Sequence, residues 1–391
     1  MQPYSGIRVL DISQGIAGPY CAQILAAQGA EVIKVEPPSG DWGRFVGYTK
    51  GDQSALSIHY NQGKRAVALD ARTDEGRALL KDLVAQCQVL IQNFRPGVAE
   101  RLGIDYASLA KTQKDIVCVS ITGYGPTGPA ANLPASDSVL QADSGLMHAN
   151  RTQAGEPKRI GMLLADSVTG LYAAQALSAA LYQRLLTDQG SHIQTSLFEA
   201  CVALQGMNLV DHALAGDRPA DAVSAPNGVF STADGQMTVL TLNDDQFGRL
   251  CRAIEAPEWL TDVRFSSNTS RMAHRDALHA SLTRLMQEKN TAYWVEAFTK
   301  HEVLHAIVRD YAGLLSHPQA AVLGLFKPTI QPGVGQFPSI PFPAAIFSSQ
   351  LSVSPSIGQD TVSVLESLGI ESSRIESLLA KGVLVQSEVK P

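Results

Sequence analysis

The sequence predicts an α/β protein with a doubly wound parallel sheet in a large domain, followed by a smaller α+β domain. Short apolar runs alternate with helix-spaced segments through the first half, and a hairpin pattern followed by helices occupies the middle. The length of 391 residues also exceeds what one hydrophobic core usually serves. We expect the large domain at residues 1–215, the small domain at 220–315, and a return segment at 316–391 that completes the large domain.

The first βαβ unit begins with the apolar run 7–12, continues with helical spacing over 19–28, and ends in the strand-like run 31–36. A crossover helix between two strands implies that these strands pair in parallel. The alternation continues with a helix at 74–87 and strands at 64–70, 89–93 and 116–122.

A long helix rich in Ala and Leu is predicted over 163–186, where small residues would let it pack closely and lie buried. A hairpin is predicted over 228–242, turned at Asp234 and Gly235, because a polar Asp-Gly pair separates two strand-like runs. Helices then follow at 245–254, 271–286 and 291–301, a Pro- and Gly-rich stretch at 332–343, and two further helices at 360–368 and 373–379.

Composition excludes several classes of protein. With 31 basic and 37 acidic residues and no basic run, the chain is a poor nucleic-acid binder. No segment has the features of a signal peptide or approaches about 20 apolar residues, so we expect a cytoplasmic protein with no membrane partner. Five scattered cysteines without a C-x-x-C pair indicate buried thiols in a reducing compartment: Cys21, Cys87, Cys118, Cys201 and Cys251.

Two short motifs suggest other chemistries. Residues 123–128 match G-x-G-x-x-G, but Pro126 and Pro129 indicate a loop where a dinucleotide-binding site needs a helix. Residues 301–305 read H-E-V-L-H, which on a helix would place His301 and His305 for zinc. No third ligand stands out, so we expect a helix end with surface histidines and no metal, and a zinc hydrolase remains an alternative.

Asp166 lies near the start of the predicted long helix, where an Asp usually caps backbone N–H groups. Its surroundings, G-M-L-L-A-D-S-V-T-G-L-Y-A-A-Q-A-L, resemble the nucleophile region of the class III CoA-transferases, the CaiB/BaiF superfamily of formyl-CoA and carnitine CoA-transferases. The likeness covers most of the first two hundred residues. It includes A-G-P at 17–19, G-A-E-V-I-K-V-E-P-P at 29–38, K-R-A-V-A-L-D at 64–70, N-F-R-P-G at 93–97, G-Y-G-P-T-G-P at 123–129 and Q-G-S-H-I-Q-T-S-L-F-E-A at 189–200.

This resemblance implies a Rossmann-like large domain and a homodimer of interlocked rings. It also implies that CoA moves from an acyl-CoA thioester to a free carboxylic acid, without a tightly bound cofactor. Asp166 would be the catalytic nucleophile and would form an aspartyl anhydride and then an aspartyl-CoA thioester. An ordinary Asp, with a pKa near 3.9, would be ionised at neutral pH without a helper base.

By the same resemblance, a set of residues that follow the predicted strands should contact CoA, although an arbitrary Arg is usually solvated surface. These residues are Leu69, Arg72, Asn93, Phe94, Arg95, Arg101 and Leu102. Ile16, Ala17 and Asp137 are expected as neighbours of the active site. Asp137 could equally cap the next helix.

The chain departs from the family at several positions. Pro37 and Pro134 stand where some members have Arg and Lys, and the stretch 225–228 has one Gly where formyl-CoA transferases have a glycine-rich lid. Ala306 and Ile307 replace a Gly-Pro pair of many relatives. The α-methylacyl-CoA racemases of the same superfamily use a His at the position of Ser136, so transfer is favoured over that alternative. A CoA-binding protein without catalysis is a further alternative.

Overall fold

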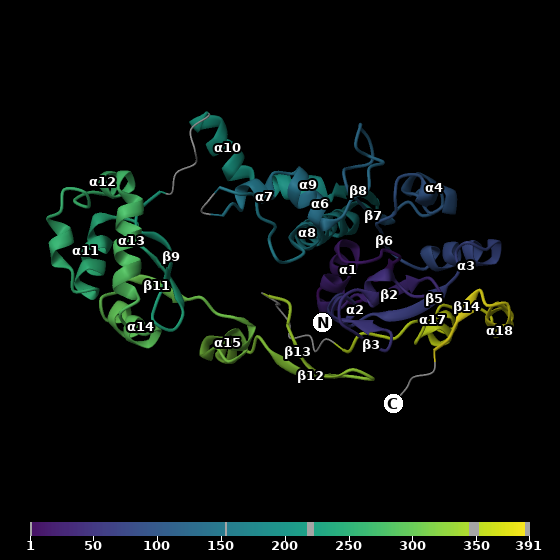
Figure 1. The fold of residues 1–391 in the computed structure, drawn as a ribbon. Coiled ribbons are helices and arrows are strands. Elements are labelled where there is room, and N and C mark those ends of the chain that lie inside the picture. The colour runs from purple at the N-terminus through teal and green to yellow at the C-terminus, as the bar shows by residue number, and fades with distance from the viewer. Residues whose placement is uncertain (1, 153–154, 217–222, 344–351, 388–391) are drawn as a thin grey trace. The chain divides into compact units, whose positions relative to one another are not determined.

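The structure is a computed structural model that describes residues 2–152, 155–216, 223–343 and 352–387 (Figure 1). The chain divides into two compact units. Unit 1 comprises Met1–Leu209 and Leu325–Pro391, and unit 2 comprises Val210–Gly324.

Unit 1 is built on a sheet that has, within the described residues, seven strands in the order β14-β5-β2-β1-β6-β7-β8. All neighbours pair in parallel except β14, which pairs antiparallel with β5. The prediction of a large parallel sheet is therefore confirmed. The strands are β1 (Arg8–Asp11), β2 (Glu31–Glu36), β5 (Arg65–Leu69), β6 (Val89–Gln92), β7 (Val117–Thr122), β8 (Ser191–Ser196) and β14 (Leu384–Val385).

The order of the strands reverses beside β1. The chain adds β2 and β5 on one side of β1, and then returns to add β6, β7 and β8 on the other side. Because parallel strands end at the same edge, the loops after β1 and β6 separate there and leave a crevice, where ligands bind in open α/β sheets.

Alternate residues of the strands feed two cores on the two faces of the sheet. Val9 belongs to the first core and Leu10 to the second. The first face is covered by α1 (Ala17–Ala27), α6 (Asp137–Asp143), α7 (Leu146–Ala149), α8 (Leu164–Thr187) and α9 (Leu197–Leu204). The second is covered by α3 (Asp74–Ala85), α4 (Val98–Leu102), α5 (Tyr106–Leu109), α17 (Thr361–Ser367) and α18 (Ser372–Ala380).

The long helix α8 begins against α1. A Cβ at Gly170 would lie 2.8 Å from the carbonyl oxygen of Ala17, so only glycine allows this close approach. The prediction that this helix lies buried was correct for one side only, because Tyr182, Leu185 and Leu186 are exposed. In α10 (Gly206–Ala215), the described side chains include no buried residue.

Shorter elements complete unit 1: η1 (Trp42–Phe45), β3 (Thr49–Lys50), β4 (Gln53–Ser54) and α2 (Ala55–Asn61). The Pro- and Gly-rich stretch at 332–343 was not predicted as a strand, yet it supplies the second strand of the hairpin β12 (Lys327–Gln331) and β13 (Gly335–Ser339). Pro328 lies opposite Pro338 there. A two-stranded ribbon tolerates both prolines because each strand is an edge strand.

Unit 2 has a sheet whose order in the described residues is β11-β10-β9, packed with helices around its own core. The predicted hairpin is confirmed. The helices expected after it are also confirmed, except that His274 divides the expected helix 271–286 into two. The elements are β9 (Asn227–Ser231), β10 (Gln236–Leu240), α11 (Asp244–Ala253), η2 (Pro257–Leu260), α12 (Asn268–Ala273), α13 (Arg275–Met286), α14 (Thr291–Lys300), β11 (Leu304–Ile307), α15 (Tyr311–Leu315) and α16 (Pro318–Val322).

Candidate active site

A cavity of about 510 Å³ lies at the carboxyl edge of the unit 1 sheet. Its walls come from the loops after β1, β6 and β7 and from the first residues of α1, α6, α8 and α9. The cavity brings together seven residues that the sequence singles out: Ile16, Ala17, Asn93, Phe94, Arg95, Asp137 and Asp166.

The other four predicted residues do not line this cavity. Leu69 is buried in the second core, and Leu102 is half-buried and packs against that core. Arg72 has a side chain that is 88% exposed and pairs with Asp70 at 2.8 Å. Arg101 is an exposed residue of α4. Leu69 is the last residue of β5 and Arg72 follows that strand, whereas Arg101 and Leu102 end α4.

Asn93 joins the two loops that flank the crevice. Its side-chain oxygen accepts a hydrogen bond from the backbone N–H of Gln14 at 2.8 Å, and its side-chain nitrogen donates to the carbonyl of Gln14 at 2.7 Å. This reciprocal pair fixes the loop after β1 to the loop after β6. Asn93 therefore holds the shape of the cavity as well as lining it.

The first turn of α8 is capped from another helix. One oxygen of Asp137 accepts hydrogen bonds from the backbone N–H groups of Ala165, at 2.8 Å, and Asp166, at 3.3 Å. The N-cap residue, Leu163, makes no side-chain cap. The N-cap role that local sequence gave to Asp166 was wrong, because Asp137 satisfies these N–H groups. The carboxylate of Asp166 is not used as a cap and lines the cavity.

The second oxygen of Asp137 accepts a hydrogen bond from the side chain of Gln141 at 2.7 Å. The same side-chain nitrogen also donates to the carbonyl of Met162 at 3.1 Å, and the Gln141 oxygen accepts from the N–H of Ile160 at 2.9 Å. Ile160 and Met162 lie in the segment that leads into α8. Gln141 therefore fixes this segment as well as the carboxylate of Asp137.

Burial, together with the negative charge of Asp137, raises the pKa of Asp166 to about 7. Desolvation disfavours the charged form of a carboxyl group, and a like charge nearby does the same. The expectation of a fully ionised Asp166 at neutral pH was therefore wrong. A carboxyl group with such a pKa titrates in the range where enzymes work, which is typical of functional sites.

A second, smaller cavity of about 110 Å³ adjoins the first and shares Phe94, Arg95, Pro96 and Thr122 with it. Inside it the side chain of Gln92 accepts from the N–H of Phe94 at 2.7 Å and donates to Ser120 at 2.8 Å. Arg95 is exposed and lines both cavities, which makes it the predicted arginine best placed to meet an anionic ligand there.

Some cavity residues were not identified from the sequence. Gln14 follows β1, Trp42 lies in η1 after β2, and Leu197 begins α9 after β8. The rule that ligands bind beyond the carboxyl ends of parallel strands could have identified all three, because each follows a strand of the sheet.

The positions that depart from the family pattern lie in different environments. Ser136 is the N-cap residue of α6 and lines the cavity beside Asp137. Pro134 is exposed and Pro37 is half-buried. In unit 2, Ala225 is fully buried and Gly228 lies within β9, so the stretch expected at a lid leads into a strand.

The two short motifs do not form the sites that their patterns suggest. The 123–128 segment is a loop between β7 and α6 and opens no helix. Helix α14 ends at Lys300, Glu302 has a positive φ, and His305 lies in β11. The two histidines therefore do not lie one turn apart on a helix. Among the residues that the structure describes, no group of three or more His, Cys, Asp or Glu side chains could hold a metal ion, and no helix is long and apolar enough to cross a membrane.

Comparison with known proteins agrees with the sequence resemblance. A family model described as CoA-transferase family III matches residues 4–361. The acetyl-CoA:oxalate CoA-transferase of Acetobacter aceti is 36% identical over 326 residues, which cover 82% of this chain and 84% of that protein. The human succinyl-CoA:glutarate CoA-transferase is 32% identical over 405 residues, covering 99% of this chain and 91% of that protein.

Solved structures show the same fold. A CaiB/BaiF family protein from Brucella suis superposes with a TM-score of 0.83 at 31% identity, covering 94% of this chain and 99% of that chain. A protein from Mycobacterium tuberculosis superposes with a TM-score of 0.82 at 27% identity, covering 93% and 98%.

Proposed function

Because the chain belongs to CoA-transferase family III, we propose that it moves CoA from an acyl-CoA to a free carboxylic acid through covalent intermediates on Asp166. Transfer of CoA between an acyl-CoA and a carboxylic acid is the activity of the named relatives. The covalent route and the roles of individual residues are the substance of the proposal.

In this mechanism the carboxylate of Asp166 attacks the thioester carbonyl, and the C–S bond breaks to give a mixed anhydride and CoA thiolate. The thiolate attacks the aspartyl carbonyl and releases the donor acid, leaving an aspartyl-CoA thioester. The acceptor carboxylate attacks that thioester and forms a second anhydride. The thiolate then attacks the acceptor's carbonyl, which gives the new acyl-CoA and restores Asp166. No net proton is taken up or released.

One observation carries the proposal. Asp137 occupies the N–H groups of Ala165 and Asp166, so the Asp166 carboxylate lines the cavity without a capping role. Ile16 and Ala17, at the start of α1, line the same cavity. We propose that backbone N–H groups there stabilise the oxyanion that forms when the thioester carbonyl is attacked.

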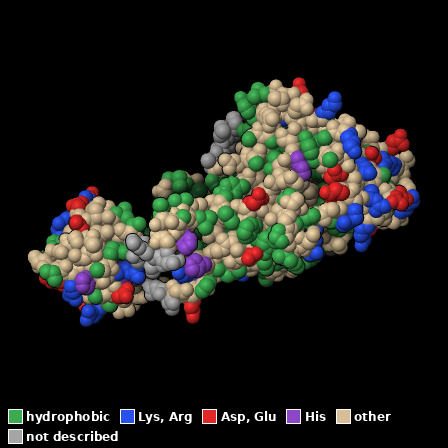
Figure 2. Space-filling model, turned by 90° about the horizontal axis from the view of Figure 1, so that it is seen from above, with side chains coloured by type: hydrophobic (Ala, Val, Ile, Leu, Met, Phe, Trp, Pro, Cys, Tyr) green, Lys and Arg blue, Asp and Glu red, His purple; other side chains and the backbone are tan. Residues whose placement is uncertain are grey.

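CoA carries several phosphate charges, which cationic side chains must meet. We propose that Asn93, Phe94 and Arg95 contact CoA within the cavities. The phosphates and adenosine would then extend toward the other predicted residues: Leu69, Arg72, Arg101 and Leu102. Figure 2 shows that Lys and Arg side chains gather toward the end of unit 1 where Figure 1 places α3, α4 and α18.

The substrates are proposed from the relatives. Their names pair acetyl-CoA with oxalate and succinyl-CoA with glutarate. Oxalate and glutarate are both small dicarboxylic acids. We propose that this chain uses a short dicarboxylic acid as acceptor and acetyl-CoA or succinyl-CoA as donor.

We also propose that the protein is a homodimer in which unit 1, expected at residues 1–215 and 316–391, forms the CoA-binding domain, and unit 2, expected at residues 220–315, forms the smaller domain. The exposed apolar side chains of α8 and α10 support this, since Leu185 is 76% exposed and Met207 is 80% exposed. Light scattering after gel filtration should give twice the mass of one chain. A mass equal to one chain would contradict the dimer.

The activity is tested by incubating the protein with acetyl-CoA or succinyl-CoA and a panel of mono- and dicarboxylic acids, and by following new acyl-CoA with chromatography. We expect new acyl-CoA only when an acceptor acid is present. The α-methylacyl-CoA racemase alternative would instead exchange the α-hydrogen of a branched acyl-CoA with deuterium and need no acceptor. Ser136, which lacks a basic side chain, disfavours that reaction.

A further inference from the structure

Side chains hold the middle of the loop between β1 and α1. Five consecutive backbone groups, from the N–H of Ser13 to the N–H of Gly15, each hydrogen-bond to a side chain. Their partners are, in order, Asp11, Lys34, Asn93 for both groups of Gln14, and Asp41. Ser13 and Gly15 are buried, so their backbone groups need partners within the protein, and side chains from four other positions supply them.

Two of these partners form a buried ion pair. The Nζ atom of Lys34 lies 3.0 Å from Oδ2 of Asp41, and their side chains are 0% and 2% exposed. Asp41 also accepts from the N–H groups of Gly15, at 3.0 Å, and Gly43, at 2.9 Å. Removing two charges from water costs several kcal/mol per ion, and a buried pair often stabilises a fold no better than apolar residues would. Stability alone therefore does not account for the pair.

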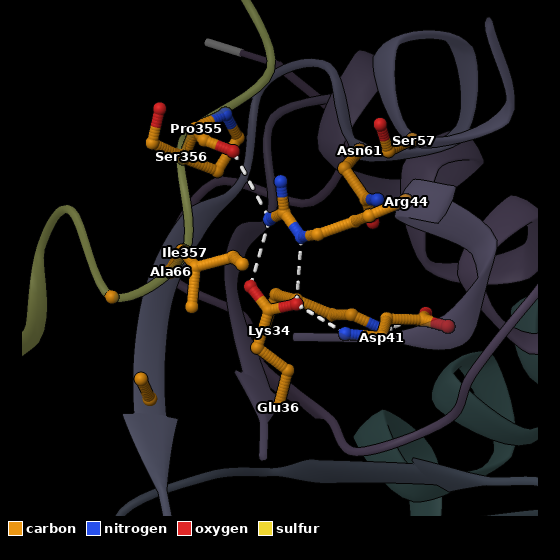
Figure 3. A network of polar contacts seen from close by, with 12 residues as sticks. Lys34, Glu36, Asp41, Arg44, Ser57, Asn61, Ala66, Pro355, Ser356 and Ile357 are labelled. Atoms are coloured by element: carbon orange, nitrogen blue, oxygen red, sulfur yellow. Dashed lines mark hydrogen bonds and ion pairs between the residues drawn. The ribbon is translucent and has the colours of Figure 1, made fainter. Parts of the chain in front are cut away.

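A neighbouring ion pair lies in the same network but does not bond to the loop. Figure 3 shows the Arg44 guanidinium between the carboxylate of Glu36 and the carbonyl of Pro355. Arg44 and Glu36 are as deeply buried as Lys34 and Asp41, and the backbone N–H of Asp41 donates to Glu36 at 2.9 Å. Arg44 binds the return segment of the chain, so it offers a matched comparison for Asp41.

The loop continues directly into the wall of the cavity. Gly15 has a φ of +77°, and a Cβ there would lie 2.2 Å from the indole ring of Trp42, so the indole packs directly on this backbone. Ile16 and Ala17 follow and line the cavity with Asp166. Asp41 and Trp42 thus hold the loop from adjacent positions of one turn.

We propose that Asp41 is a positioning residue for CoA transfer, which with Lys34 fixes the loop Ser13–Gly15 so that the cavity wall beside Asp166 is formed before the substrate binds. The proposal rests on the proposed function. Asp41 is not among the residues that line the cavity, so it acts through the loop and not on the substrate. Preformed sites hold reacting groups within fractions of an ångström, and small displacements lower the rate.

The test compares Asp41→Asn with Arg44→Gln, using succinyl-CoA and glutarate. For Asp41→Asn we expect kcat to fall about 10- to 100-fold while KM for succinyl-CoA changes less than about threefold. Arg44→Gln should keep kcat within about threefold of the natural protein, whatever its loss in Tm. Equal losses of kcat in both variants, or an unchanged kcat in Asp41→Asn, would overturn the proposal.

Amide hydrogen exchange of the substrate-free protein gives a readout that is independent of catalysis. The peptide containing residues 13–17 should exchange faster in Asp41→Asn and at the natural rate in Arg44→Gln. An unchanged rate in Asp41→Asn would show that Asp41 does not hold the loop. If the natural protein transferred no CoA, the proposed function and the catalytic part of this inference would both fail, while the exchange rates would still decide the structural part.

Discussion

One carboxylate oxygen of Asp137 lies 3.3 Å from the backbone nitrogen of Asp166 and accepts its hydrogen bond. The two residues are 29 positions apart in the sequence, so one acidic residue caps the helix turn that carries another. This arrangement leaves the Asp166 carboxylate available for chemistry. It also places a second negative charge near Asp166, which raises the pKa of Asp166 and makes its ionised form less stable.

The pH dependence of activity should report the pKa of Asp166. Only the ionised carboxylate can attack a thioester, and burial with the charge of Asp137 raises this pKa to about 7. We expect kcat/KM to rise with pH and to reach half of its maximum near pH 7. In Asp137→Asn the midpoint should move to lower pH, because the like charge is gone. Initial rates across the pH range test this, and an unmoved midpoint would contradict the assigned coupling.

The same pKa predicts a gain in stability when the charge of Asp166 is removed. The folded-state pKa lies above the unfolded value, so this residue's contribution to stability is complete below about pH 4 and is lost as pH rises through about 7. Asp166→Asn should therefore be more stable than the natural protein at pH 8, by about 1–3 kcal/mol, and show a much smaller difference at pH 4. Urea unfolding at both pH values measures the difference.

Asp70→Asn is the control for that comparison. Hydrogen bonds from Arg72 lower the pKa of Asp70 to about 2, so removing this charge should not stabilise the protein at pH 8. A similar gain in stability from both substitutions would mean that the effect is a general one of net charge.

The arginines predicted from the sequence should differ in their effects. Arg95 lines both cavities, and Arg95→Ala should raise KM for the acyl-CoA about tenfold or more.

The guanidinium of Arg72 donates two hydrogen bonds to the carboxylate of Asp70, two positions earlier in the chain. Arg264 makes the same arrangement with Asp262 in unit 2. Arg264→Ala is thus a matched control for Arg72→Ala. If Arg72 contacts CoA, Arg72→Ala should raise KM for the acyl-CoA and Arg264→Ala should not. Equal KM values for the acyl-CoA in the two variants would show that Arg72 does not bind CoA.

The sheet could be predicted because its strands are short apolar runs separated by helices. The β8 strand lies at one edge of the sheet, and it was missed because its residues, Ser191–Ser196, are polar except for Ile193 and form no apolar run. The β12–β13 hairpin was missed because Pro328 and Pro338 are poor strand formers outside an edge. Both failures arise from tertiary position, which a local pattern does not contain.

The candidate site could be predicted in part. Asp166 and Asn93 were found through resemblance, but the contacts that define their roles join distant segments. The cap on α8 comes from Asp137, and the loop after β1 is held by Lys34 and Asp41. No local signal indicates such contacts. The raised pKa of Asp166 could not be predicted either, because it depends on burial and on Asp137.

Transfer of oxygen into Asp166 tests the central claim most directly. In the proposed mechanism the acceptor carboxylate attacks the aspartyl-CoA thioester, and CoA then takes the acceptor's acyl group, so one acceptor oxygen remains on Asp166. After turnover with an acceptor acid labelled with ¹⁸O in its carboxyl groups, the peptide containing Asp166 should be heavier by one or two labelled oxygens. The released donor acid should also become labelled in later turnovers. An active enzyme whose Asp166 peptide stays unlabelled would contradict the covalent mechanism.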